Sequence, residues 1–358
     1  MKMKKTATLT FQNADNYGAI LQAYALHKTI TNFGIENHIL NYQCEYLGKP
    51  YGLAALKRKG LIRFILGVAY YIVRMPRKSK FSELRSQMKL TPELNKSDLI
   101  NLEEQYDGFI VGSDQVWNDS ISDLDSSFFL DFVKASEKKL SYAASFGFES
   151  MPNDLKNEYK ELLKDFSSFN MRESSGVEII DSLLKKPAKL VLDPTLLLTG
   201  EEWDTIANAP IIKEKYILVY QTAPSSFLIK SVKKIAKSTG FKVVVVPFPL
   251  GGFLKAKLNL SAGPREWIGL IRDAEIVVTD SFHGCCFSIL YNKRFFVCIP
   301  ESPTRIYNLL NVFKLNECLH KPGSELELTN EIDWVKINDT LRDERKRSVN
   351  ILKGMLKI

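Results

Sequence analysis

The sequence lacks the short motifs that mark the commonest cofactor and metal sites. It contains neither G-x-G-x-x-G nor G-x-x-x-x-G-K-[ST], so a dinucleotide site of the usual kind or a P-loop is not expected. It also has no H-E-x-x-H, and none of its four His lies at zinc-ligand spacing. We therefore expect no metal and no cofactor.

Cysteine is scarce, and no two Cys are spaced as C-x-x-C. The five are Cys44, Cys285, Cys286, Cys298 and Cys318. Free thiols without a disulfide framework are typical of a reducing cytoplasm. The basic N-terminus lacks the apolar core of a signal peptide and is interpreted as a first strand. A cytoplasmic location is therefore expected.

Long hydrophobic runs are absent as well. The longest, Phe64–Val73, has 10 residues, whereas a membrane-spanning helix needs about 20. Residues 57–80 around it hold eight basic side chains and no acidic one. They form part of an insertion at about 54–90, which either packs on its domain or lies on anionic lipid headgroups at the inner membrane face.

That segment accounts for the whole charge imbalance. The chain has 49 Lys+Arg and 41 Asp+Glu, and without the eight basic residues 41 face 41. The net charge of +8 therefore belongs to one insertion. No basic and aromatic pattern elsewhere suggests a nucleic-acid partner.

What the sequence does contain is a regular alternation of strand-like and helix-like segments. Short apolar runs such as Gly108–Val111 and Phe241–Pro247 alternate with amphipathic stretches, which is typical of parallel sheets covered by helices. The pattern restarts after residues 197–209. We predict an α/β protein of two doubly wound domains, 1–200 and 201–330, followed by a C-terminal helix at 331–358.

Polar residues follow almost every predicted strand. In an open parallel sheet ligands bind outside the carboxyl ends of the strands, so these residues are the candidate site. In chain order they include Asn13, Asn16, Tyr17, Gly18, Ser113, Asp114, Arg172, Ser281, His283 and Gly284.

His283 is the sharpest single candidate, because it lies at a strand-to-helix turn just before Gly284. A helix N-terminus favours an anion, and a His there can act as a general acid or base. Arg172 either clamps a carboxylate or phosphate or pairs with a nearby acid, and Arg305 is a weaker candidate of the same kind. Asp114 either orients a sugar hydroxyl or caps a turn.

Several long strings together resemble the polysaccharide pyruvyl transferase family. They are N-Y-G-A-I-L-Q-A-Y-A-L (16–26), F-I-V-G-S-D-Q-V-W-N (109–118), M-R-E-S-S (171–175), L-D-P-T-L-L-L (192–198) and V-T-D-S-F-H-G-C-C-F-S-I-L-Y-N-K-R-F (278–295). The resemblance implies a GT-B-like architecture, with two Rossmann-like domains facing a central cleft. It also implies phosphoenolpyruvate as the donor and a sugar diol as the acceptor.

The resemblance further assigns roles to residues. The family's donor-binding Arg matches Arg172, and its catalytic His matches His283. Together with Ser281, Gly284 and Arg305 they would hold the donor, and the C-terminal domain would be the donor side. The acceptor, a free sugar or a lipid-linked oligosaccharide, would contact the N-terminal group, namely Asn13, Asn16, Tyr17, Gly18, Ser113 and Asp114.

One position departs from the family pattern. Well-studied members carry Arg two residues before the catalytic His, where this chain has Ser281. Arg305 or Lys293–Arg294 supplies the missing charge, or the donor differs. Two other functions therefore stay open: a GT-B glycosyltransferase that uses a nucleotide sugar, and a non-catalytic scaffold in a polysaccharide assembly complex.

Overall fold

The computed structural model describes residues 3–46, 76–208, 212–246, 257–258, 261–299, 304–324 and 331–358. The chain divides into two compact units. The first contains residues 1–72, 82–197 and 344–358, and the second contains 73–81 and 198–343. Residues 57–75 of the basic segment lie outside the described residues.

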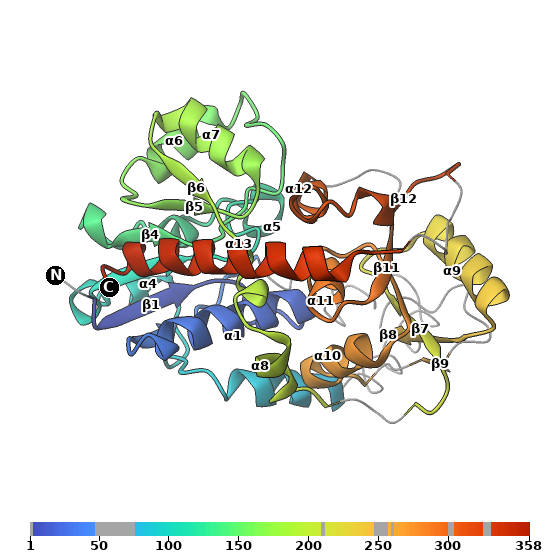
Figure 1. Ribbon diagram of the computed structural model, residues 1–358. Coiled ribbons are helices and arrows are strands. Elements are labelled where there is room, and N and C mark those ends of the chain that lie inside the picture. Colours follow the sequence, from blue (N-terminus) through green and yellow to red (C-terminus); the bar gives the residue numbers. More distant parts are fainter. Residues whose placement is uncertain are drawn as a thin grey trace, which may run out of the picture. The chain divides into compact units, whose positions relative to one another are not determined.

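The first unit is built on parallel strands (Figure 1). Four of them form a sheet in the order β2-β1-β3-β4, and β5 pairs with β6. Bridges from Leu140 to Ser168 and from Ala144 to Met171 connect the two sets. The strands are β1 (Lys5–Leu9), β2 (Glu36–Ile39), β3 (Gly108–Val111), β4 (Lys139–Ser141), β5 (Phe169–Met171) and β6 (Ala188–Leu190).

The helices of this unit connect the strands in the doubly wound manner. They are α1 (Tyr17–Asn32), α4 (Lys96–Leu99), α5 (Asp119–Ser122), α6 (Lys156–Leu163) and α7 (Ser174–Leu184), with 3-10 turns η2 (Glu103–Gln105), η3 (Ser126–Phe129), η4 (Ser136–Lys138) and η5 (Pro194–Leu196). The strand order changes direction between β1 and β3, since β1 pairs with β2 on its other side. A ligand is expected at the carboxyl ends of those two strands.

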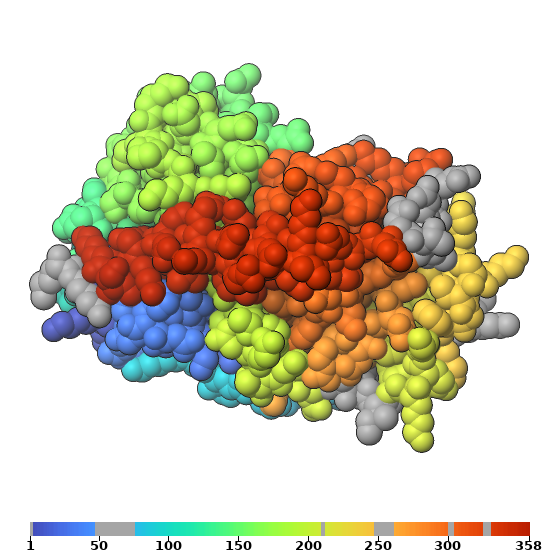
Figure 2. Space-filling view, in the orientation of Figure 1, coloured from blue at the N-terminus to red at the C-terminus, as the bar shows by residue number. Residues whose placement is uncertain are grey.

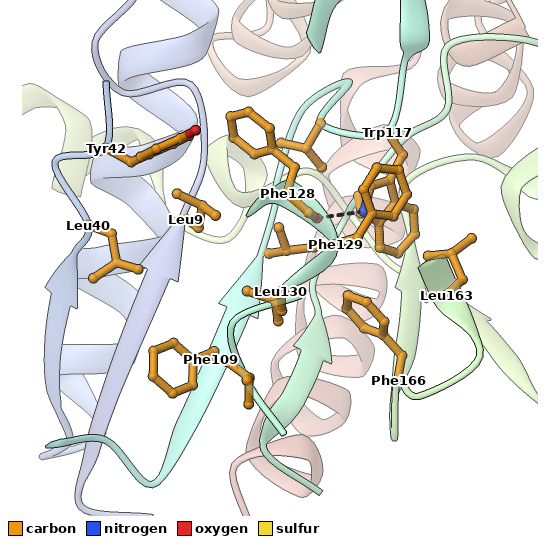
Figure 3. Packing of buried hydrophobic residues seen from close by; sticks show 14 of the residues in the cluster. Leu9, Leu40, Tyr42, Phe109, Trp117, Phe128, Phe129, Leu130, Leu163 and Phe166 are labelled. Carbon is orange, nitrogen blue, oxygen red and sulfur yellow. Dashed lines mark hydrogen bonds between the residues drawn. The ribbon is translucent and has the colours of Figure 1, made fainter. Parts of the chain in front are cut away.

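An aromatic cluster forms the core on one side of this sheet (Figure 3). The Trp117 indole is fully buried, packs edge-on to Phe166 and donates a hydrogen bond of 2.9 Å to the Phe128 carbonyl. The Tyr42 hydroxyl donates to Asp125 at 2.6 Å. The G-S-D-Q-V-W-N string therefore has its Trp in the core and its polar residues at the strand end.

The second unit holds a six-stranded parallel sheet in the order β12-β11-β10-β7-β8-β9. Its elements are α8 (Gly200–Asp204), β7 (Tyr216–Tyr220), α9 (Ser226–Thr239), β8 (Lys242–Val246), β9 (Lys257–Leu258), α10 (Pro264–Asp273), β10 (Ile276–Thr279), α11 (Phe282–Leu290), β11 (Arg294–Cys298), α12 (Thr304–Phe313), η6 (Asn316–Cys318) and β12 (Leu319–His320). Chain order runs outward in both directions from β7 and β10, as in a Rossmann fold.

Helices cover both faces of this second sheet. Leu228, Val232 and Ile235 of α9 pack with Ile217 and Val219 on one face. On the other face, Trp267 of α10 packs against Tyr220 and Phe287. Both faces of the strands are therefore apolar, which explains the unbroken valine run in β8.

The division of the chain differs from the predicted domains in two respects. Residues 73–81, placed in the N-terminal domain from the sequence, belong to the second unit, and residues 344–358 belong to the first. The last helix, α13 (Trp334–Met355), therefore begins in one unit and ends in the other, and its surface is visible along its length in Figure 2. Within the described residues, no helix is long and apolar enough to cross a membrane.

Candidate functional site

The loop between β1 and α1 and the first turn of α1 carry four of the predicted acceptor residues. Asn16 is exposed and caps α1, because its side chain accepts a hydrogen bond from Ala19 N at 3.2 Å. Asn13 is partly buried and donates to the Tyr42 carbonyl. Tyr17 and Gly18 are buried in the first turn of α1.

Arg85 holds this loop in place, which the sequence did not indicate. Its guanidinium donates to the carbonyls of Gln12 and Asn13 and forms an ion pair of 2.7 Å with Asp15. The contacts join positions 70 to 73 residues apart. No local signal predicts such a contact.

The loop after β3 lies beside it, because β1 and β3 are paired. Gly112 has φ +107°, and a Cβ there would lie 2.4 Å from the Tyr142 carbonyl oxygen, so only glycine fits. Ser113 is fully buried, and its backbone N donates to Gln22 Oε1. Asp114 follows with φ +78° and a partly buried carboxylate.

Arg172 lies at the centre of a buried ionic network in the first unit. Its Nη1 donates to Asp114 Oδ1 at 3.4 Å and to Asp193 Oδ2 at 3.3 Å, and its Nε lies 3.6 Å from Glu173 Oε2. Ser113 Oγ donates to Asp193 Oδ2 at 3.0 Å. The network thus joins the ends of β3, β5 and β6. We call Arg172, Ser113, Asp114, Glu173 and Asp193 the Arg172 network.

The charges of this network explain the protonation of its arginine. Burial by itself lowers the pKa of Arg172, but Asp114, Glu173 and Asp193 outweigh that effect and raise the pKa. The side chain of Arg172 is only 1% exposed. In this structure Arg172 pairs with three nearby carboxylates.

The second unit has its own cluster at the carboxyl ends of β7 and β10. Asp280 accepts hydrogen bonds from Thr222 N at 2.6 Å and Ala223 N at 3.1 Å, so it ties the two strand ends together. Burial raises the pKa of Asp280, although these two backbone donors act in the opposite direction. Gln221 is buried beside them at the end of β7.

His283 lies in the first turn of α11 in this cluster. His283 is 8% exposed, and its ring packs edge-on to the ring of Phe282. Ser281 caps the helix, accepting from Gly284 N at 3.4 Å. A Cβ on Gly284 would lie 2.5 Å from Thr279 Oγ1, so the glycine lets α11 approach β10 closely. The helix begins two residues earlier than the sequence predicted, because the cap is Ser281.

The remaining predicted cations are placed as follows. Arg305 is partly buried in the first turn of α12 in the second unit. Of the basic segment, Arg77 is buried with its guanidinium 4.9 Å from the centre of the Phe81 ring. Lys80 pairs with Glu266 at 2.5 Å. Two of the basic residues therefore contact this protein's own side chains.

Sequence reasoning missed several members of both clusters. The sequence pattern predicts a turn at Asp193-Pro194, and it assigns no individual role to Glu173, Gln22, Gln221 or Asp280. The available signal was position along the chain: Asp280 directly follows the buried β10, Glu173 lies two residues after β5, and Asp193 lies three residues after β6. The partners of Asp193 and Asp280 were not visible because they follow other strands, whereas Arg172, the partner of Glu173, is its neighbour in the chain.

Other features of the described residues bear on the chemistry. No group of three or more His, Cys, Asp or Glu among them could hold a metal ion. Cys285 and Cys286 are fully buried core residues.

A pocket of about 580 Å³ lies between α13 and the β5 region, lined among others by Asn170 and Arg347. None of the predicted site residues lines it.

The two parallel sheets and their strand-end clusters define an α/β protein with a GT-B-like fold. Residues 16–302 match the polysaccharide pyruvyl transferase family. The chain therefore belongs to that family. No curated protein sequence matches the chain at a significant level.

Solved structures support the fold assignment. The chain is similar to UDP-GlcNAc 2-epimerase from Methanocaldococcus jannaschii, with 12% identity over 98% of this chain and 100% of that one and a TM-score of 0.54. It is also similar to MnaA of S. aureus in complex with UDP, with 13% identity, 100% and 97% coverage and a TM-score of 0.54. At such identity the likeness concerns the fold alone.

Proposed function

We propose that this protein transfers a pyruvyl group from phosphoenolpyruvate to two hydroxyls of one sugar, forming a cyclic ketal during synthesis of a bacterial surface polysaccharide. Membership of the family supports a transferase. The observation that carries the proposal is the position of His283, in the first turn of α11 at the strand ends where ligands bind in such sheets. No cofactor is required.

The second unit would bind the donor. The N-terminus of α11, with Ser281, His283 and Gly284, carries a partial positive charge that suits a phosphate or carboxylate. Ser281 is neutral where related proteins carry Arg, so Arg305 on α12 is the proposed source of the missing charge. The hydrogen bond from Gly284 N to Ser281 is long, at 3.4 Å, and an anion would compete with it well.

The chemistry needs one proton donor and two hydroxyls held in place. His283, as an imidazolium, would protonate C3 of phosphoenolpyruvate while a sugar hydroxyl attacks C2. Phosphate then leaves as the second hydroxyl attacks C2 and closes the ring. Orientation and electrostatic stabilisation supply the rate enhancement.

The first unit would bind the acceptor at the ends of β1 and β3. Asn13, Asn16 and Asp114 have exposed or half-buried polar side chains that can bond to sugar hydroxyls. Tyr17, Gly18 and Ser113 are buried behind them and would shape the surface. This arrangement suits an uncharged diol.

The first prediction concerns His283. His283→Gln should lower kcat by about 10²- to 10⁴-fold, the usual contribution of general acid catalysis, and weaken phosphoenolpyruvate binding by a much smaller factor. The assay measures phosphate release with phosphoenolpyruvate and a panel of free and lipid-linked glycosides, and calorimetry measures donor binding. Full activity in His283→Gln would disprove the assigned role, and no phosphate release on any acceptor would count against the function.

The nucleotide-sugar alternative is separated by ligand stabilisation. A ligand that binds the folded protein raises its melting temperature. Phosphoenolpyruvate should raise it and UDP should not, whereas the reverse result would favour a glycosyltransferase. Stabilisation by phosphoenolpyruvate without turnover on any acceptor would favour a non-catalytic scaffold, the alternative that Ser281 suggests.

A further inference from the structure

The Arg172 network presents only one of its charged groups to the surroundings. The side chain of Asp114 is 16% exposed, whereas those of Arg172, Glu173 and Asp193 are 1%, 3% and 0% exposed. A molecule that reaches the ends of β1 and β3 therefore meets the Asp114 carboxylate and not the guanidinium.

The formal charge of the network also disfavours an anion. One guanidinium and three carboxylates sum to −2, with the two buried acids behind the arginine. Like charges brought together in a desolvated site are unfavourable. A hydroxyl, which is neutral and can donate a hydrogen bond, suits this surface better than phosphoenolpyruvate does.

The two oxygens of Asp114 are held differently. Oδ1 accepts from Gln115 N at 2.9 Å and from Arg172 Nη1 at 3.4 Å. Within the described part of the chain no hydrogen bond reaches Oδ2. The backbone is fixed as well, because the Asp114 carbonyl accepts from Ser145 N at 3.0 Å. One oxygen is therefore anchored and the other is available to a ligand.

The position of Arg172 is in turn determined by the groups behind it. Asp193 accepts a hydrogen bond from Arg172 Nη1. It also accepts hydrogen bonds from Ser113 Oγ at 3.0 Å and from Thr195 Oγ1 at 2.7 Å. A buried side chain with fixed partners cannot swing out to a ligand without breaking these contacts. Asp114 is the partly exposed charge through which Arg172 would act on a substrate.

We propose that Asp114 is the general base that takes the proton of the attacking sugar hydroxyl, and that Arg172 is a positioning residue for it rather than a donor clamp. The inference rests on the proposed function. As the hydroxyl oxygen bonds to C2, its proton moves to Asp114 Oδ2, while C3 takes a proton from the general acid. The second hydroxyl then attacks C2, its proton restores the general acid, and phosphate leaves with the proton held by Asp114.

The test measures kcat and donor affinity separately in full-length protein. Asp114→Asn should lower kcat by about 10²- to 10⁴-fold and change the Kd for phosphoenolpyruvate, measured by calorimetry, by less than threefold. Asp114→Glu should recover part of the lost rate. The matched control is Asp181→Asn, which neutralises an exposed Asp on α7 of the same unit and should keep wild-type kinetics.

The double variant distinguishes positioning from donor binding. If Arg172 acts through Asp114, Arg172→Lys should lower kcat in the wild type but cause no further loss in Asp114→Asn, within about threefold. If Arg172 clamps the donor, the two losses multiply and Arg172→Lys weakens phosphoenolpyruvate binding tenfold or more. Multiplying losses with weaker donor binding would overturn the inference.

The outcomes separate this inference from the function on which it rests. An active wild type with an equally active Asp114→Asn overturns only the role of Asp114. An inactive wild type that does not bind phosphoenolpyruvate overturns both. If Arg172→Lys fails to fold, the kcat and Kd values of Asp114→Asn and Asp114→Glu still decide the question.

Discussion

Gly284 shows how one residue sets the geometry around His283. The Cβ of any other residue would lie 2.5 Å from Thr279 Oγ1 and 3.0 Å from its Cγ2. Thr279 in turn accepts a hydrogen bond from Ser281 N at 3.0 Å, so it cannot move away freely. The strand, the turn and the first helical turn are thus packed on one another without spare volume.

Gly284→Ala should therefore destabilise the second unit by about 1–3 kcal/mol, the usual cost of adding a methyl group to a filled core. Thermal unfolding measures the loss. Thr279→Ser should restore part of it in the double variant, because it removes the Cγ2 methyl. Gly354→Ala is the control, since nothing lies within 4 Å of its Cβ position in α13. Equal melting of Gly284→Ala and wild type would disprove this packing.

At the scale of elements, His27 ties α1 to β2 and to the segment after helix 76–85. Its Nδ1 lies 3.0 Å from Asn37 Oδ1 in β2, and its Nε2 accepts from Lys89 N at 3.3 Å. That second contact requires a neutral ring. Burial lowers the pKa of His27 below 6.5, against the opposing effect of Asn37.

The lowered pKa makes stability depend on pH in a defined direction. Above pH 6.5 the ring is neutral in both states and the stabilisation is complete. As the pH falls below 6.5 the unfolded chain binds the proton first, so stability declines until the pH passes the folded pKa. Urea unfolding should show a smaller loss between pH 7 and pH 5 in His27→Gln than in wild type. An identical loss would rule out this contribution.

At the scale of the whole molecule, the charge imbalance remains concentrated in residues 57–80. Since Arg77 and Lys80 contact the protein itself, membrane attraction would come from the other basic residues of the segment. We propose peripheral binding to an anionic bilayer through these charges, which would bring the enzyme to a lipid-linked acceptor.

Replacing Lys57, Arg58, Lys59 and Arg63 by Gln should weaken binding to vesicles with anionic lipid by up to about 4 kcal/mol, at about 1 kcal/mol for each charge near the surface. Vesicle sedimentation measures the change, and added salt should have a similar effect. Lys78→Gln, a single exposed change, should matter far less. Equal binding to neutral and anionic vesicles would favour a packed insertion.

The regular elements were largely predictable from local pattern. The strand at Tyr216–Tyr220 lies where the apolar run predicts it. The helical spacing predicts a first helix over Gly18–Phe33, and α1 (Tyr17–Asn32) differs from that range by one residue at each end. Helix 76–85 was not assigned as a separate element. Its side chains Arg77 and Lys80 read as an exposed basic flank, because their partners Phe81 and Glu266 are found only in the folded chain.

The sequence by itself determined the α/β class, the family and the place of His283 at a strand end, because these depend on periodicity and on contiguous strings. Only the tertiary structure decided that Asp114 and Asp193 lie against Arg172 together with its chain neighbour Glu173. Those carboxylates come from the ends of three strands, and parallel pairing, not spacing along the chain, brings such ends together. A charge network of this kind follows from the order of the strands in the sheet.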